Sequence, residues 1–98
     1  MRPYTTKGGS TIDLDAVQAV TRIEMSLGGF SSVILRVYAF VHGGRVLLDS
    51  SFLPGEMSCE RIGYLGSIPP NDLDVDAARA DLEATRIEFI NAWTGKAQ

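Results

Sequence analysis

The acidic residues between positions 72 and 83 have a spacing that could bind calcium. Asp72, Asp74 and Asp76 alternate, and Glu83 stands at the twelfth position of the segment, as in an EF-hand loop. That loop needs a glycine at its sixth position for a sharp turn, where this chain has Ala77. We therefore expect no metal here and interpret the acids as charges that favour the positive end of a helix.

The single histidine and the single cysteine are the other residues that could carry out chemistry. As a general base, His42 would need a nucleophile and an orienting carboxylate close by, but Asp49 and the serines beside it come several residues further along the next strand. Cys59 is expected to behave as a small apolar residue. One His and one Cys cannot supply the four ligands of a structural zinc site. We therefore predict no catalytic residue, no metal and no cofactor, and we expect a protein that is not an enzyme.

Polar residues within the apolar segment Val33–His42 and after it leave an alternative open. In this alternative the chain is a small-molecule-binding protein or a simple enzyme. Its pocket would lie between the sheet and a loop of residues 54–71. The polar groups that would line this pocket are Arg36, Tyr38, His42 and Cys59. Neither the ligand nor any protein partner can be identified from these residue types.

The composition is that of one ordinary globular domain. The chain has 98 residues, 45% of them hydrophobic and 21% charged, so we expect a single domain over residues 1–98. A formal net charge of −3 weighs against binding to nucleic acid. The longest apolar runs fall short of the roughly 20 residues that a membrane helix needs. A lone cysteine and an N-terminus without a signal peptide predict a cytoplasmic protein.

Pairs of glycines divide the first half of the chain into apolar segments, a pattern typical of β-hairpins. The breaks predict four strands. They are Arg2–Thr6, a second segment over residues 10–27 that is interrupted by a turn at Asp15 and Ala16, Val33–His42, and a last strand from Val46 to Phe52 or Leu53. Val46, Leu48 and Phe52 are expected to share one face of the last of these strands. Residues 54–71 are predicted either to add a fifth strand near residues 61–65 or to form a packed loop.

The last quarter of the chain has the spacing of an amphipathic helix. Apolar residues recur every three or four positions from Val75 to Trp93, after a capping residue at Asn71 or Asp72 and before a terminating glycine at Gly95. The predicted fold class is therefore α+β. It consists of an antiparallel sheet of four strands, or five, packed against one C-terminal amphipathic helix.

The strand at Val33–His42 is apolar on both faces, whereas one helix covers only one face of a small sheet. Ile34, Tyr38 and Phe40 share one of these faces. A loop of residues 54–71 would leave a monomer, and a second copy of the chain would give a homodimer. We predict the homodimer, with these three residues at its interface, and hence a non-catalytic, self-associating binding module.

Overall fold

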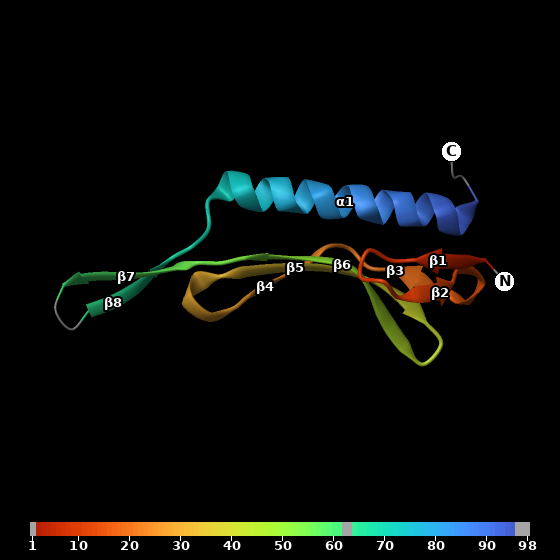
Figure 1. Ribbon diagram of the computed structural model, residues 1–98, viewed down its shortest axis with the longest axis horizontal. Helices are drawn as coiled ribbons and strands as arrows, with labels where there is room; N and C mark the ends of the chain where they lie inside the picture. The colour runs from red at the N-terminus through yellow and green to blue at the C-terminus, as the bar shows by residue number, and fades with distance from the viewer. Residues whose placement is uncertain (1, 62–63, 96–98) are drawn as a thin grey trace.

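A computed structural model describes residues 2–61 and 64–95 of the chain, with the side chains of residues 57–67 outside the described set. It confirms the predicted fold class, since antiparallel strands pack against a single C-terminal helix in the described residues (Figure 1). The elements are β1 (Pro3–Thr5), β2 (Thr11–Asp13), the 3-10 turn η1 (Leu14–Ala16), β3 (Ala19–Val20), β4 (Glu24–Leu27), the 3-10 turn η2 (Gly29–Ser31), β5 (Val33–Val41), β6 (Gly44–Leu53), β7 (Glu56–Arg61), β8 (Tyr64–Ile68) and α1 (Asp72–Thr94).

Both ends of α1 lie where the sequence predicts them. The Asn71 side chain accepts a hydrogen bond from the Leu73 amide at 2.7 Å, which caps the first turn. Gly95 ends the helix in the left-handed conformation, with φ of 78°. One stripe of α1 is buried, including Leu82 and Phe89.

Strand β5 is the centre of the main sheet. It pairs with β6 along one edge, and with β3 and then β4 along the other edge. The strand predicted over the later part of residues 10–27 is therefore interrupted between β3 and β4. Thr21 bridges the gap, because its amide donates to the Tyr38 carbonyl at 2.9 Å and its hydroxyl accepts from the Tyr38 amide at 3.0 Å.

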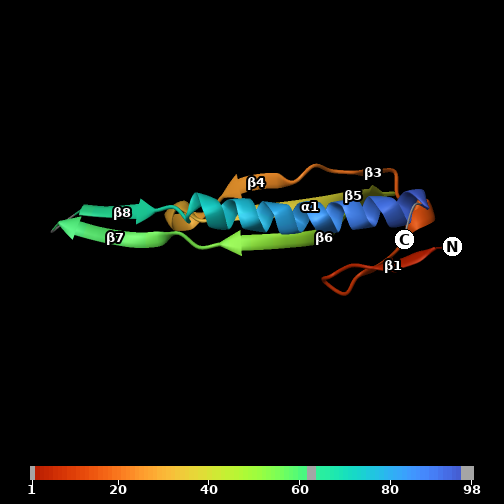
Figure 2. The ribbon, with the colours of Figure 1, turned by 90° about the horizontal axis from the view of Figure 1, so that it is seen from above.

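Helix α1 lies along one face of this sheet, as Figures 1 and 2 show from two directions. The residues of β5 that face it are Val33, Leu35, Val37 and Ala39, all of them buried. They form one hydrophobic core with the stripe of α1 and with Ile12, Leu14 and Val17 from the N-terminal segment. The core is thus confined to the side of the sheet that α1 covers.

The opposite side of the sheet is called the open face below. The register places on it Glu24, Ile34, Arg36, Tyr38, Phe40, Arg45, Leu47, Ser50 and Phe52. The expectation that Val46, Leu48 and Phe52 share a face is wrong. The register shifts by one residue at Val37 and Tyr38, so that Leu48 is buried towards α1 whereas Phe52 pairs with Ile34 on the open face.

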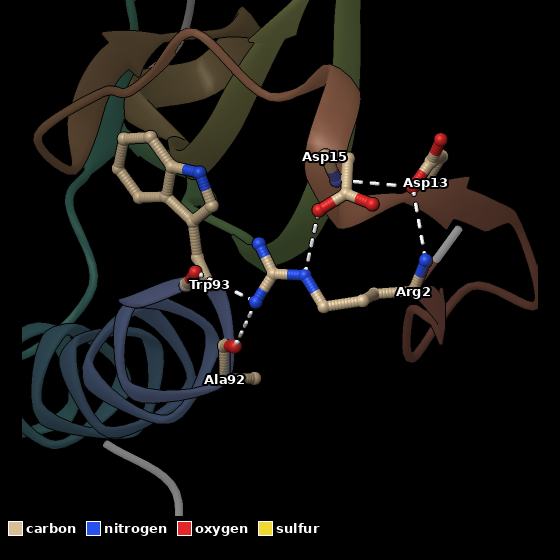
Figure 3. A network of polar contacts seen from close by, with 5 residues as sticks. All are labelled: Arg2, Asp13, Asp15, Ala92 and Trp93. Atoms are coloured by element: carbon tan, nitrogen blue, oxygen red, sulfur yellow. Dashed lines mark hydrogen bonds and ion pairs between the residues drawn. The ribbon is translucent and has the colours of Figure 1, made fainter. Parts of the chain in front are cut away.

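The N-terminal hairpin of β1 and β2 is attached to the end of α1 (Figure 3). The Arg2 guanidinium donates to the carbonyl oxygens of Ala92 and Trp93, at 3.4 and 3.1 Å. The same group bonds the Asp15 carboxylate at 2.7 Å, and this hydrogen bond holds the pKa of Asp15 below its usual value. Arg2 therefore supplies a donor to the Trp93 carbonyl in the last turn, where helices leave carbonyl groups without an intrahelical partner. It adds a second donor to the Ala92 carbonyl, which also accepts from the Gly95 amide at 3.4 Å.

Residues 54–71 form neither a single strand nor a loop packed on the sheet. Strands β7 and β8 pair with each other, from Glu56 with Ile68 to Arg61 with Tyr64, and extend as a hairpin beyond the sheet and α1 (Figures 1 and 2). We call this hairpin the arm. Its projection lengthens the molecule to 61 Å, with a radius of gyration of 17.1 Å, where a compact chain of this length would have about 13 Å.

The base of the arm is held close to η2. A side chain at Gly55 would place its Cβ 1.8 Å from the Phe30 carbonyl oxygen, so only glycine fits there. Phe30 and Ser31 in turn have φ values of 54° and 61°, a left-handed conformation that non-glycine residues rarely adopt. The direction in which the arm leaves the sheet is thus set by a close backbone contact.

Candidate interaction surface

The structure separates the four residues predicted to line a ligand pocket into three places. Arg36 and Tyr38 lie two residues apart on the open face. His42 is exposed in the turn between β5 and β6. Cys59 belongs to β7, and its side chain lies outside the described residues. The ten residues of β6 lie between His42 and the arm, which corresponds to about 33 Å of extended strand.

The three residues predicted for the interface are neighbours on the open face. Ile34, Tyr38 and Phe40 all point to the side opposite α1, and Arg36 lies between Ile34 and Tyr38 in the same row of β5. Two residues of β6 extend this apolar row. Phe52 pairs with Ile34 and is 62% exposed, and Leu47 pairs with Tyr38 and is 40% exposed, while Phe40 itself is 41% exposed.

Phe52 and Leu47 are the members of this surface that sequence reasoning missed. Strict alternation assigns Phe52 to the same side as Leu48, and only the extra residue in β6 reverses that assignment. One signal is present in the sequence, because Leu47 and Leu48 are two large apolar residues in succession within an alternating strand. Such a pair indicates a place where both sides of a strand are apolar or where its register changes.

Charged groups of both signs lie among the apolar residues of the open face. The Arg45 guanidinium lies 4.1 Å from the centre of the Tyr38 ring, and its Nη1 lies 3.9 Å from Glu24 Oε1. In the register of β4 and β5, Glu24 lies directly opposite Arg36. An exposed cation over an aromatic ring contributes about 0.5–1 kcal/mol. These contacts hold the Tyr38 ring against the sheet, while the sheet surface beside it stays accessible.

A cavity of about 330 Å³ lies at the base of the arm. Its walls come from the end of β6, the first residue of β7, the last of β8 and the start of α1. They are formed by Leu53, Pro54, Glu56, Ile68, Pro69, Pro70, Asn71 and Asp74. The cavity therefore does lie between the sheet and part of residues 54–71, but its walls contain none of the four polar residues predicted to line such a pocket.

A smaller cavity, of about 120 Å³, lies between the N-terminal hairpin and α1, next to Lys7 and Thr85. The nearby Asp49 carboxylate accepts a hydrogen bond from the Thr85 hydroxyl at 3.2 Å and lies 3.5 Å from Lys7 Nζ. Burial, and secondarily the charge of Glu88, raises the pKa of Tyr4 at the edge of this cavity. Because Asp49 has partners on β1–β2 and on α1, we interpret this cluster as a connection between elements.

Metal-binding groups, membrane-spanning helices and similarity to known proteins also bear on the function. Among the side chains that the structure describes, no group of three or more His, Cys, Asp or Glu residues could hold a metal ion. None of the helical residues described forms a segment long and apolar enough to cross a membrane. No family model, curated protein or solved structure matches this chain. The open face is therefore the feature on which we base a function, because its exposed apolar residues lie on one side of the sheet, on either side of the Arg36 and Ser50 pair.

Proposed function

We propose that this protein is a non-catalytic interaction module that associates with a second copy of itself through the open face. The observation that carries the proposal is the exposure of Phe40, Leu47 and Phe52 on one side of the sheet, next to the half-buried Ile34 and Tyr38. Several exposed large apolar residues grouped with polar residues on one face are typical of a protein–protein interface. The proposed compartment remains the cytoplasm, where a single thiol stays reduced.

The charges on the open face favour a second copy as the partner. A two-fold axis places the same surface on both sides of an interface, so that surface must complement itself. The open face carries Arg36, Arg45 and Glu24. A glutamate of one copy can therefore meet an arginine of the other, which a face with charges of only one sign would not allow.

The cavity at the base of the arm supports a second candidate function, binding of a small molecule. At about 330 Å³ it falls within the range of small-ligand pockets. Its walls combine apolar surface with polar groups, among them the carboxylates of Glu56 and Asp74. This combination would suit a small ligand with an apolar body and a positive charge. Thermal-shift screening against cationic metabolites tests this second candidate. If none of these compounds raises the Tm of the protein, the candidate is wrong.

Replacement of Phe52 tests the association through the open face. Burying the 62% of Phe52 that is exposed would remove about 125 Å² from water if a phenylalanine side chain has roughly 200 Å². At about 25 cal/mol per Å² this contributes roughly 3 kcal/mol for each copy. Phe52→Ser should therefore raise the dimer Kd at least about 100-fold.

Analytical ultracentrifugation of the wild type and two variants measures this effect. Ile87→Ser is the matched control, because Ile87 is 49% exposed on α1, away from the open face. We expect Ile87→Ser to keep the wild-type dimer and Phe52→Ser to sediment as a monomer. A wild type that stays monomeric at high concentration, or a Phe52→Ser variant that associates like the wild type, would overturn the proposal.

A further inference from the structure

The turn η2 holds a large aromatic residue in an unfavourable backbone conformation. Phe30 has φ of 54° and ψ of 40°, and Ser31 follows with φ of 61°. In this left-handed conformation Cβ crowds the following carbonyl oxygen, which disfavours every residue with a side chain, Asn and Asp least of all. Gly28, two positions before Phe30, has no Cβ but keeps φ of −108°. The strain therefore falls on a phenylalanine and a serine although a glycine is close by.

Contacts on both sides of η2 fix this conformation. The Gly28 amide donates to the Ser32 carbonyl at 2.9 Å, and the Ser32 amide donates to the Gly29 carbonyl at 3.1 Å. Ser32 is buried, and Gly55 lies so close to the Phe30 carbonyl that no Cβ fits there. Strained residues persist where their surroundings determine them in this way, and they are concentrated at functional sites. The strain of η2 thus indicates that the turn does more than connect two strands.

The ring of Phe30 has little packing inside its own chain that would offset the strain, because it is 60% exposed. Aromatic residues are enriched in the buried centres of protein interfaces. A side chain on a rigid backbone also loses less freedom on association than one on a mobile loop. The ring therefore has the properties of a residue that is buried only when a partner binds.

The turn η2 borders the open face at the end that carries Ile34 and Phe52. A Cβ on Gly28 would lie 3.5 Å from Cδ1 of Ile34, whose side chain belongs to the open face. Figure 1 shows the connection between β4 and β5 on the side of the sheet away from α1. Gly55, which touches the Phe30 carbonyl, follows Phe52 by three positions. Phe30 is thus presented beside the most exposed apolar end of this face.

We infer that Phe30 anchors the association of two copies, and that its strained backbone is retained because the ring packs against the open face of the partner copy. The inference rests on the proposed function, and it adds to the interface a residue that the pairing of the strands does not place there. A two-fold interface uses the same surface on both copies, so each copy supplies one such ring and receives one.

Replacement of Phe30 by asparagine separates association from folding. Asparagine tolerates the left-handed conformation and lacks the ring, so Phe30→Asn should raise the Tm of the monomer by a few degrees. The same variant should raise the dimer Kd about 100-fold, because Phe30 is nearly as exposed as Phe52. Analytical ultracentrifugation gives the Kd. Circular dichroism well below that concentration gives the Tm of the monomer, since association adds to apparent stability.

Ser31→Asn is the matched control, because it changes the adjacent left-handed residue and keeps the ring. It should leave the dimer Kd unchanged, and a weaker dimer would assign the effect to the backbone of the turn and overturn the anchor. A lower monomer Tm for Phe30→Asn would show that the ring supports the fold, which also overturns it. If Phe30→Asn associates like the wild type while Phe52→Ser is a monomer, the anchor is wrong and the proposed function stands. A wild type that is monomeric overturns both proposals.

Discussion

Replacing Phe89 tests whether α1 covers the sheet as described. The Phe89 ring is fully buried, its centre lies 5.0 Å from the centre of the Tyr4 ring, and the two ring planes are perpendicular at 90°. Removing a buried phenylalanine ring loses about 2–3 kcal/mol of transfer free energy. A residual cavity of roughly 80 Å³ at about 24 cal/mol per Å³ adds about 2 kcal/mol. Phe89→Ala should thus lower the free energy of unfolding by about 4 kcal/mol, a large part of the roughly 5–15 kcal/mol typical of a domain.

The assay is denaturant unfolding followed by the fluorescence of Trp93, the single tryptophan, which packs against the core at the end of α1. Protein concentration must be the same for all variants, because association adds to apparent stability. Phe89→Leu keeps most of the apolar volume and should cost about 1–2 kcal/mol. A double-mutant cycle between Tyr4 and Phe89 should give a coupling of about 0.5–1.5 kcal/mol. A loss below about 1 kcal/mol for Phe89→Ala would show that the helix does not bury this residue against the sheet.

The remaining predictions concern the arm, a carboxylate and a helix cap. Gly55→Ala would place a Cβ 1.8 Å from a backbone carbonyl oxygen of η2, so calorimetry should show a lower Tm than for Gly44→Ala, whose Cβ would meet nothing within 4 Å. Arg2→Met should raise the pKa of Asp15 towards its usual value in an NMR titration, because the Arg2 hydrogen bond lowers it. The stability that this hydrogen bond contributes is present above the pKa of the carboxyl in the unfolded chain, and it is lost as the pH falls through the lower pKa of the folded protein. An Arg2→Met variant that unfolds in acid at the same pH as the wild type would contradict this contribution. Asn71→Ala should cost about 1 kcal/mol in urea unfolding through loss of the cap, and an unchanged midpoint would mean that the cap contributes nothing.

Features set by neighbouring residues could be predicted from the sequence. Asn71 and Gly95 mark the ends of α1 because the chemistry of a cap depends on a few consecutive residues. The alternation of β5 likewise shows that both of its faces are apolar, and the structure puts Leu35 and Val37 under α1 with Tyr38 on the opposite side. These predictions needed no knowledge of distant contacts.

Features that depend on pairing between segments could not be predicted. The extra residue in β6 moves Phe52 to the open face. The Leu47 and Leu48 pair indicates an irregularity in β6, but it does not distinguish a shift in register from a strand that is apolar on both sides. The arm follows from pairing of Glu56 with Ile68 and from the close approach of Gly55 to Phe30, which lies 25 positions earlier in the chain. Alternation of residue types does not reveal such an approach.

The position of α1 at the end of the element order has a consequence for protein synthesis. The face of β5 that carries Leu35 and Val37 is complete once β6 has been made, yet its cover, α1, extends to Thr94. At about 5–20 residues per second, a ribosome needs a few seconds to add the rest of the helix. During that interval the nascent sheet exposes both apolar faces. We therefore expect that a chaperone must bind the nascent chain, or that aggregation must be slower than synthesis, until α1 emerges.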